Sequence, residues 1–369
     1  MKIALVHDDI IQWGGAERLL KAMHEIWPKA PIYTSVFEPP NFCLKHFTNV
    51  KVNTSWMQKL PFKKKLARHY FFLYPLAFEQ FDFTGFDVVL SSSTRFAHGV
   101  ITKPETMHIA YINSPPRMFW ESGEYFKNES SILRTVISPF LSYLRVWDRV
   151  ASSRPDFIIS NAKTPQARIK KYYGRDSEII YPFVDIDRFR GEDTGEVNYF
   201  LTVSRLAPWK RIRIVVEACN YLRVPLKIIG AGPDYADLKK LAGPTVELLG
   251  SLTDEEVVSY YKHCRAFISP QEEDFGITPL EALAAGKPVI AYRAGGALET
   301  IVEGQVGEYF YPQTVSALSK VIKNFKSEKY KREICRKQAL KFSKEQFESK
   351  LKAFVDRKYR EHVQARKRL

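Results

Sequence analysis

Short apolar runs alternate with amphipathic or polar stretches along this chain, and the alternation occurs twice. In the first half the pattern predicts buried strands at 3–7, 86–91, 107–112 and 156–160, with a helix from Ala16 to about Ile26 after the first strand. In the second half it predicts strands at 199–204, 225–229, 246–249, 266–269 and 288–291, with helices such as 254–264 and 278–285 between them. Buried strands that alternate with helices form parallel sheets, because each crossover helix covers a sheet face. The sequence therefore predicts an α/β fold with two doubly wound, Rossmann-like parallel sheets.

The alternation restarts near Tyr181-Pro182, and the polar stretch 188–198 is typical of a linker. A chain of 369 residues also exceeds what one hydrophobic core usually organises. We therefore predict one domain over 1–182 and a second over 183–349. The chain is predicted to be helical and basic from Val315 onward, with a C-terminal helix of about 350–369 packing back on the first domain.

Composition is that of an ordinary folded protein, with 45% hydrophobic and 26% charged residues. No apolar run reaches the roughly 18 residues that span a bilayer, and the apolar start at 3–6 is too short for a signal-peptide core. We therefore expect a cytoplasmic protein. The four cysteines (Cys43, Cys219, Cys264 and Cys335) are far apart and are interpreted as buried thiols, neither a disulfide framework nor a metal site.

The net charge of +15 needs an explanation. Segment 56–74 mixes Lys63, Lys64, Lys65 and Arg68 with aromatic residues, which is typical of an interfacial membrane segment. The alternative is a helix packed on the first domain with a solvated basic face; the composition favours an anionic membrane surface as partner. No nucleic-acid motif accompanies the charge, so no nucleic-acid partner is expected.

The richest stretch runs from Ser269 to Ala291 and has the order strand, acidic loop, helix, glycine, strand. Thr278 is predicted as the N-cap of its helix, Pro279 as the first helical residue and Gly286 as the C-terminal stop. The free N–H groups of that helix could hold an anion. Glu281 has two interpretations: it closes a Thr278-x-x-Glu281 capping box, or it serves a ligand site.

Glu273-x7-Glu281, followed by Ala-x3-Gly-x-Pro-Val-Ile-Ala, resembles the signature of retaining glycosyltransferases of family 4, which have the GT-B fold. Further matching stretches follow the family order over almost the whole chain: Gly14-Gly15-Ala16-Glu17, Pro182-x2-Asp185-x3-Phe189, Val203-Ser204-Arg205-Leu206-x3-Lys210 and Gly230-x-Gly232-Pro233. The resemblance implies two domains facing a cleft, an acceptor-side first domain and a second domain that binds the nucleotide sugar.

The resemblance also implies roles for single residues. Arg205 and Lys210 would bind the donor diphosphate as two fixed cations, although each could be a plain surface cation. Glu273 would accept hydrogen bonds from the transferred sugar, beside the backbone amides of Phe275 and Gly276. With Arg205 and Lys210 it forms the predicted catalytic set.

The remaining donor-side roles concern Glu281, which would hold ribose hydroxyls, and the pair Gly14 and Gly15. These glycines would let the N-terminal loop approach the phosphates and the acceptor; the alternative is a plain tight turn. Gly230-x-Gly232 does not indicate NAD, because Tyr235 occupies the third glycine position of that fingerprint.

A family-type reaction implies a retaining, metal-independent hexosyltransferase with no cofactor beyond its GDP- or UDP-linked donor. Asp185-x-Asp187 is accordingly assigned to the interdomain segment, and no metal site is predicted. Mannose is the sugar suggested, and the acceptor would be a glycan or lipid-linked molecule of lipopolysaccharide type at the inner face of the cell membrane. A non-catalytic nucleotide-sugar-binding or scaffolding protein of the same fold is the alternative.

One stretch departs from the family pattern. Tyr111-Ile112-Asn113-Ser114-Pro115-Pro116-Arg117 has Asn113 where the family usually has histidine. Asparagine can hydrogen-bond a sugar hydroxyl but cannot act as a base. The acceptor-side candidates are therefore Asn113, Arg117 and His98, with His108 as a weaker substitute; the alternative for His98 is an ordinary polar loop residue.

Overall fold

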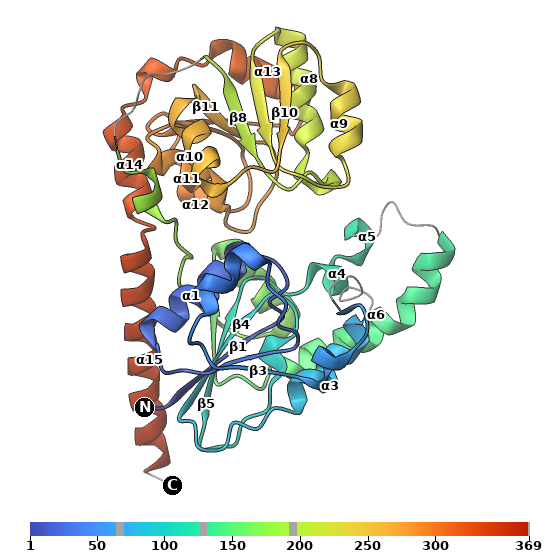
Figure 1. Cartoon of the computed structure of the whole chain (residues 1–369), viewed down its shortest axis with the longest axis vertical. Coiled ribbons are helices and arrows are strands. Elements are labelled where there is room, and N and C mark those ends of the chain that lie inside the picture. Colours follow the sequence, from blue (N-terminus) through green and yellow to red (C-terminus); the bar gives the residue numbers. More distant parts are fainter. Residues whose placement is uncertain (64–69, 126–130, 192–197, 368–369) are drawn as a thin grey trace. The chain divides into compact units, whose positions relative to one another are not determined.

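The computed structural model describes residues 1–63, 70–125, 131–191 and 198–367, and the chain divides into two units (Figure 1). Unit 1 comprises Met1–Tyr181 and Glu348–Leu369, and unit 2 comprises Pro182–Phe347. Among the residues described, no helix combines the length and apolarity needed to cross a bilayer. All four cysteines are buried thiols, as the sequence predicts.

Unit 1 is built on a seven-stranded sheet whose strands are all parallel, in the order β3-β2-β1-β4-β5-β6-β7. Its strands are β1 (Ile3–His7), β2 (Ile32–Thr34), β3 (Val52–Thr54), β4 (Val88–Ser93), β5 (Met107–Ile112), β6 (Phe157–Ser160) and β7 (Glu178–Ile179). The predictions at 3–7 and 107–112 are confirmed, and the strand predicted at 86–91 lies two residues further along. The three unpredicted strands have two or three residues each, too few for a hydrophobic pattern to show.

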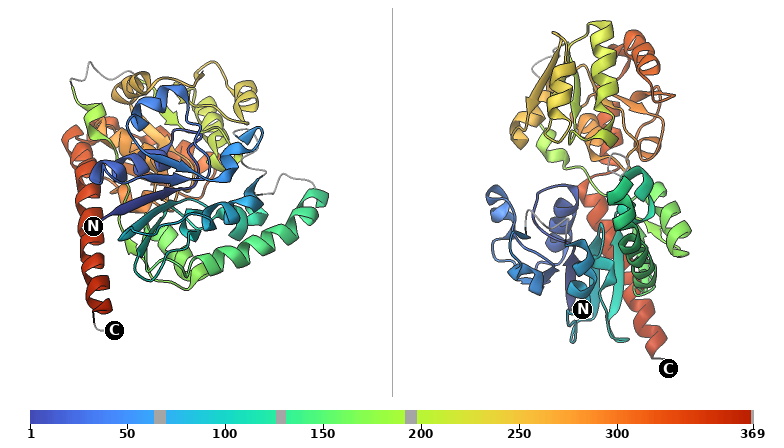
Figure 2. Two further views of the ribbon diagram at one scale, coloured as in Figure 1. Left: turned by 60° about the horizontal axis from the view of Figure 1, so that its bottom comes forward. Right: turned by 90° about the vertical axis from the view of Figure 1, so that its right-hand side faces the viewer.

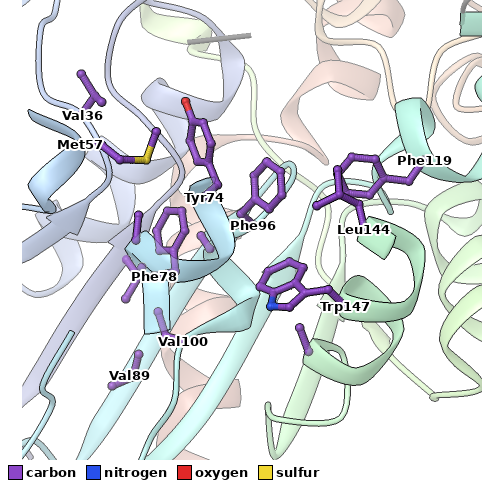
Figure 3. Close-up of a cluster of buried hydrophobic side chains, with 14 of the residues drawn as sticks. Val36, Met57, Tyr74, Phe78, Val89, Phe96, Val100, Phe119, Leu144 and Trp147 are labelled. Carbon is purple, nitrogen blue, oxygen red and sulfur yellow. The ribbon is translucent and has the colours of Figure 1, made fainter. Parts of the chain in front are cut away.

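Helices flank this sheet (Figure 1). They are α1 (Gly15–Ile26), α3 (Tyr74–Glu79), α4 (Arg117–Trp120), α5 (Ser122–Tyr125), α6 (Ser131–Ala151) and α7 (Lys163–Arg168). Figure 3 shows the cluster in which α3 and α6 meet the sheet: Tyr74 and Phe78 of α3, Phe96, and Leu144 and Trp147 of α6 are all buried. One core thus joins the strands to both helices.

The last helix, α15 (Lys344–Arg366), lies along unit 1 from Glu348 onward (Figure 2). Leu351, Phe354 and Val355 are buried. Arg357 Nη2 also forms an ion pair with Glu178 Oε2 at 2.7 Å. The end of the chain therefore contributes apolar side chains to the unit that its beginning forms.

Unit 2 repeats the architecture with six parallel strands in the order β10-β9-β8-β11-β12-β13. Its strands are β8 (Phe200–Val203), β9 (Leu226–Ile229), β10 (Val246–Gly250), β11 (Ala266–Ser269), β12 (Val289–Tyr292) and β13 (Gly307–Phe310). Its helices are α8 (Ile212–Leu222), α9 (Tyr235–Leu241), α10 (Asp254–His263), α11 (Ile277–Ala284), α12 (Ala297–Thr300), α13 (Val315–Asn324) and α14 (Arg332–Leu340). The predicted pair of doubly wound parallel sheets is confirmed. In each sheet the strand order reverses beside the unit's first strand, and ligands bind at such points.

Two predicted segments lie partly outside the described residues. In segment 56–74 these are residues 64–69, including Lys64, Lys65 and Arg68. The described part is not one helix: Trp56–Lys59 and Phe71–Leu73 are separate 3₁₀ turns, and Met57 is buried in the unit 1 core. In the predicted linker 188–198, residues 192–197 are not described, and Ile186–Phe189 forms a 3₁₀ turn.

Candidate functional site

The stretch that carries Arg205 and Lys210 follows β8 at its carboxyl end. The amide of Leu206 donates to the carbonyl of Ala231 at 2.9 Å. Gly230 has φ +143°, and a Cβ atom there would lie 1.8 Å from the carbonyl oxygen of Ser204. A glycine is therefore required at Gly230, because a side chain would displace the backbone that presents Arg205.

Two members of the predicted catalytic set are in contact in this unit. Lys210 ends the 3₁₀ turn Pro208–Lys210, and its Nζ forms an ion pair with Glu273 Oε1. Gln271 Nε2 donates to the same carboxylate oxygen at 2.9 Å. Arg205 is exposed, with its guanidinium 5.6 Å from the ring centre of Trp209. A carboxylate and two cations thus belong to the loops that follow the adjacent parallel strands β8 and β11.

The loop from Glu273 to Gly276 is held by a second pair of glycines, which the sequence analysis missed. The amide of Gly296 donates to the carbonyl of Glu273 at 2.8 Å. A Cβ on Gly296 would lie 2.2 Å from the carbonyl oxygen of Phe275. Ala294-Gly295-Gly296, which two residues separate from the end of the predicted strand 288–291, was the signal that could have revealed this contact.

The predicted start of helix α11 is wrong by two residues. Gly276 is its N-cap with φ +85°, Ile277 is its first residue, and no side chain caps it. Glycine adopts this positive-φ conformation readily, so the helix begins directly after Gly276 and before Thr278. Pro279 consequently occupies the third helical position, where its missing N–H costs nothing. The predicted stop is confirmed, since Gly286 follows the helix with φ +81°.

Glu281 does not close the capping box that was one of its two interpretations. Its Oε1 lies 3.3 Å from Arg188 Nη1, and its Oε2 accepts a hydrogen bond from the Tyr261 hydroxyl at 3.0 Å. Tyr261 is fully buried, and burial together with the Glu281 carboxylate raises the pKa of its phenol well above the usual range. Tyr261 therefore stays a hydrogen-bond donor at neutral pH. The carboxylate is fixed from two sides by residues that the sequence analysis did not single out.

In unit 1, Gly14 and Gly15 open α1. Gly14 is the N-cap with extended backbone, and its amide donates to Glu17 Oε2 at 2.8 Å. Glu17 is buried and thereby closes the helix start. The glycine pair is therefore not a tight turn of left-handed backbone, and its amides lie at the amino end of a twelve-residue helix.

The acceptor-side candidates differ in their surroundings. Asn113 follows β5, and its Nδ2 donates to the carbonyl of Ser93 at 3.3 Å. His98 is not a polar loop residue: it is buried, with Nδ1 3.0 Å from Ser93 Oγ and Nε2 3.2 Å from Asp148 Oδ1. Arg117 is exposed and pairs with Glu121 at 2.6 Å. Ser93 thus connects Asn113 with His98, while Arg117 makes none of these contacts.

His108 is buried inside β5, where its Nε2 lies 2.9 Å from Ser91 Oγ. Burial and nearby positive charges lower the pKa of its imidazole to about 3. At neutral pH His108 is therefore an uncharged core side chain.

Asp8 organises the loop that leads to His98, although the sequence analysis did not select it. Its carboxylate accepts hydrogen bonds from four successive backbone amides, at 2.6–2.9 Å: Thr94, Arg95, Phe96 and Ala97. Burial alone would raise the pKa of Asp8, but the Arg95 guanidinium and these bonds hold it below its usual value. Two acidic residues directly after a buried strand were the available signal.

A shallow surface pocket of about 350 Å³ lies along α7. Lys163, Thr164, Ala167, Arg168 and Lys171 line it. Arg168 also donates to Ser114 Oγ at 3.3 Å, next to Asn113. Three cations thus line this pocket, and one of them, Arg168, contacts the loop that carries Asn113 and also pairs with Glu121 at 2.9 Å.

Comparisons with known proteins identify a family model and relatives that match part of the chain. Residues 184–342 match the family model described as glycosyl transferases group 1, and this segment contains all the unit 2 residues above. The chain is 29% identical over 168 residues to an uncharacterized glycosyltransferase of Methanocaldococcus jannaschii, a match of 44% of this chain and 47% of that protein. It is 28% identical over 187 residues to the O-antigen chain mannosyltransferase C of Escherichia coli, covering 46% and 48%. The chain therefore spans about half the length of the curated relatives it matches.

Solved structures resemble nearly the whole chain. HepE of Anabaena in complex with UDP has a TM-score of 0.71 at 17% identity, covering 96% of this chain and 100% of that one. Sucrose-phosphate synthase of Thermosynechococcus elongatus has a TM-score of 0.69 at 13% identity, covering 97% and 99%. These likenesses establish that the chain has the GT-B fold.

Proposed function

We propose that this protein is a glycosyltransferase that moves a sugar from a nucleotide-diphosphate donor to an acceptor. The observation that carries the proposal is the ion pair between Lys210 and Glu273, on loops that follow two adjacent parallel strands. The loop of Lys210 also carries Arg205. The family match over 184–342 supports it, because that segment contains all three residues.

In the proposed mechanism, Arg205 and Lys210 stabilise the negative charge that develops on the departing diphosphate. Such charge stabilisation is strongest where the cations are already oriented, because no reorganisation is then needed during reaction. The Glu273–Lys210 ion pair orients the ammonium in the absence of donor. Glu273 then accepts hydrogen bonds from the transferred sugar, and Glu281 holds ribose hydroxyls.

The finer assignments extend the sequence resemblance. The reaction is proposed to retain the anomeric configuration and to need no metal, since the two cations take the place of one at the diphosphate. GDP- or UDP-linked sugars are the proposed donors: HepE was solved with UDP, and several relatives are named as mannosyltransferases, among them a GDP-mannose-dependent enzyme of Mycobacterium tuberculosis. A lipid-linked or polysaccharide acceptor at the cytoplasmic face of the membrane completes the proposal.

The test is a panel of GDP- and UDP-sugars, scored first by thermal stabilisation and then by transfer in the presence of EDTA. A bound donor raises the melting temperature by mass action. Lys210→Ala is expected to cost about 2.7–4 kcal/mol of transition-state stabilisation, which is a 10²–10³-fold loss of turnover. Lys227→Ala is the matched control, since Lys227 pairs with Glu247 in the same unit.

Near-normal turnover in Lys210→Ala would remove the donor-site assignment. Donor binding without transfer to any acceptor would support the alternative, a nucleotide-sugar-binding or scaffolding protein. Loss of transfer in EDTA that added metal restores would contradict the metal-independent mechanism.

A further inference from the structure

Helix α6 carries an apolar face that points away from the core. Its inner side chains Leu141, Leu144 and Trp147 are buried in the unit 1 cluster (Figure 3). Along the same helix, five large apolar side chains are between 53% and 65% exposed: Val136, Phe140, Tyr143, Val146 and Val150. Their spacing of three or four residues aligns them on one side of the helix. A soluble surface helix normally has polar residues there.

Position in the unit makes this face accessible. Figure 1 and the left view of Figure 2 show α6 at the edge of unit 1. From Val136 to Val150 the exposed face extends about 21 Å at 1.5 Å per residue. The exposed face is thus long enough to contact an extended surface.

The charges on α6 have one sign at its surface. The helix sequence contains Arg134, Arg145 and Arg149, and its single acidic residue, Asp148, is fully buried. Trp120 Nε1 donates to Asp148 at 2.7 Å. An amphipathic helix that exposes aromatic and aliphatic side chains, and whose charged surface residues are arginines, is complementary to the interface of an anionic bilayer.

We propose that the outer face of α6 docks unit 1 on an anionic lipid surface, with Phe140, Tyr143 and Val146 entering the interface. The proposal assigns membrane contact to a helix that the sequence analysis did not select, in addition to segment 56–74. It does not depend on sugar transfer, because vesicle binding can be measured without donor or acceptor. Through Asp148 the same helix reaches His98 and Trp120, so docking would occur on the element that supports the acceptor-side loop.

The experiment compares full-length variants in sedimentation with vesicles of equal parts phosphatidylglycerol and phosphatidylcholine. The test variant is Phe140→Glu with Val146→Glu. The control is Tyr221→Glu with Leu340→Glu, which introduces the same charge at exposed apolar positions of unit 2. A third variant, Phe62→Glu with Phe72→Glu, probes the described part of segment 56–74.

The partition coefficient of the α6 variant between buffer and anionic vesicles is expected to fall at least about tenfold. Two apolar side chains that would enter the interface are replaced by carboxylates, which the anionic lipid repels. The control should bind like the parent protein, and pure phosphatidylcholine should bind the parent more weakly. Unchanged melting temperatures would show that each variant is folded. Parent protein that does not sediment with the anionic vesicles, or an α6 variant that binds like the control, would overturn the proposal.

A second measurement locates the contact directly. Because all four native cysteines are buried, Val146→Cys can be labelled selectively with an environment-sensitive dye. The emission should shift to the blue on adding anionic vesicles, whereas a label at Tyr221→Cys should not respond. A different result would contradict the proposal: the α6 variant changes the oligomeric state, and the emission of the dye does not change when vesicles are added. The face would then be an interface between copies of the chain.

Discussion

At the scale of single residues, the carboxylates of Glu273 and Glu281 each accept hydrogen bonds from two side chains. The sequence motif alone predicts none of these contacts. Glu273 accepts from Lys210 and Gln271, and Glu281 from Arg188 and Tyr261. A carboxylate fixed by two donors keeps its orientation without spending ligand-binding energy on it. The second glutamate of the motif is therefore pre-oriented, although it is not a helix cap.

We expect Glu281→Gln to weaken nucleotide binding while the melting temperature changes little. A hydrogen bond to a charged group contributes about 1.5–3 kcal/mol, so affinity should fall roughly 10- to 150-fold. Calorimetric titration with the nucleotide identified in the donor screen measures the change. Glu217→Gln, which disrupts only a surface pair with Arg213, is the control. Equal affinities in the two variants would leave Glu281 with a structural role.

His108 predicts a specific acid sensitivity. Its pKa in the folded protein is about 3, below the 6.5 of an unfolded histidine. Because the folded value is depressed, its stabilising contribution is complete above pH 6.5 and is lost as the pH falls towards 3. The proton taken up on unfolding should cost up to about 1.4 kcal/mol of unfolding free energy per pH unit below that point.

Urea unfolding between pH 7.5 and 5 measures this dependence. His108→Gln is expected to be less stable at neutral pH but to lose less stability on acidification than the parent protein. His263→Gln, at a partly exposed position of unit 2, is the control for replacing a histidine outside the unit 1 core. A slope that is the same in His108→Gln and the parent would show that another group controls the acid response.

At the scale of elements, backbone contacts between loops position the candidate residues, and these contacts are only partly readable from the sequence. Long apolar runs revealed the strands at 3–7, 107–112 and 266–269, because a buried parallel strand is apolar on both faces. The strands of two or three residues were not predicted from the sequence, and neither was the close approach of Gly296 to Phe275. Glycine spacing shows where a side chain is absent, but the chain segment that occupies the space is decided by tertiary packing.

Gly230→Ala tests how strictly this packing is required. The new Cβ would meet the Ser204 carbonyl at 1.8 Å, so the stretch that carries Arg205 must move. We expect nucleotide affinity to fall at least tenfold and the melting temperature to drop. Gly304→Ala is the control, because Gly304 also has positive φ (74°) but nothing within 4 Å. Its cost should be limited to the roughly 1–2 kcal/mol of left-handed backbone. If Gly230→Ala had the same nucleotide affinity and melting temperature as Gly304→Ala, the loop could move without affecting nucleotide binding.

At the scale of the whole molecule, unit 1 is discontinuous in the chain, whereas unit 2 is a single segment. Folding of unit 1 therefore needs residues from both ends of the sequence, and contacts of such high sequence separation carry a loop-closure cost. Residues 348–369 contribute Leu351, Phe354 and Val355, with the Phe354 ring 6.5 Å from that of Phe157 in β6. Unit 2 contains the proposed donor site and needs none of these contacts.

Removing residues 348–369 should accordingly destabilise unit 1 and spare donor binding. Three buried apolar side chains contribute about 1.5–3 kcal/mol each, a sum comparable with the roughly 5–15 kcal/mol that stabilises a domain. We expect the truncated protein to lose protection from hydrogen exchange in β4 to β6 while the strands of unit 2 stay protected. Nucleotide should still raise the melting temperature of unit 2.

Two full-length variants separate the apolar from the ionic contribution of α15. Leu351→Ala should cost about 2–5 kcal/mol of unit 1 stability, because Leu351 is completely buried. Arg357→Ala should cost at most about 1 kcal/mol, since its ion pair with Glu178 is half exposed on both sides. Unchanged exchange protection of β4 to β6 in the truncated protein would mean that unit 1 folds without its C-terminal helix. If both units lost protection together, they would unfold as one cooperative body, and the independence proposed for the donor-binding unit would be wrong.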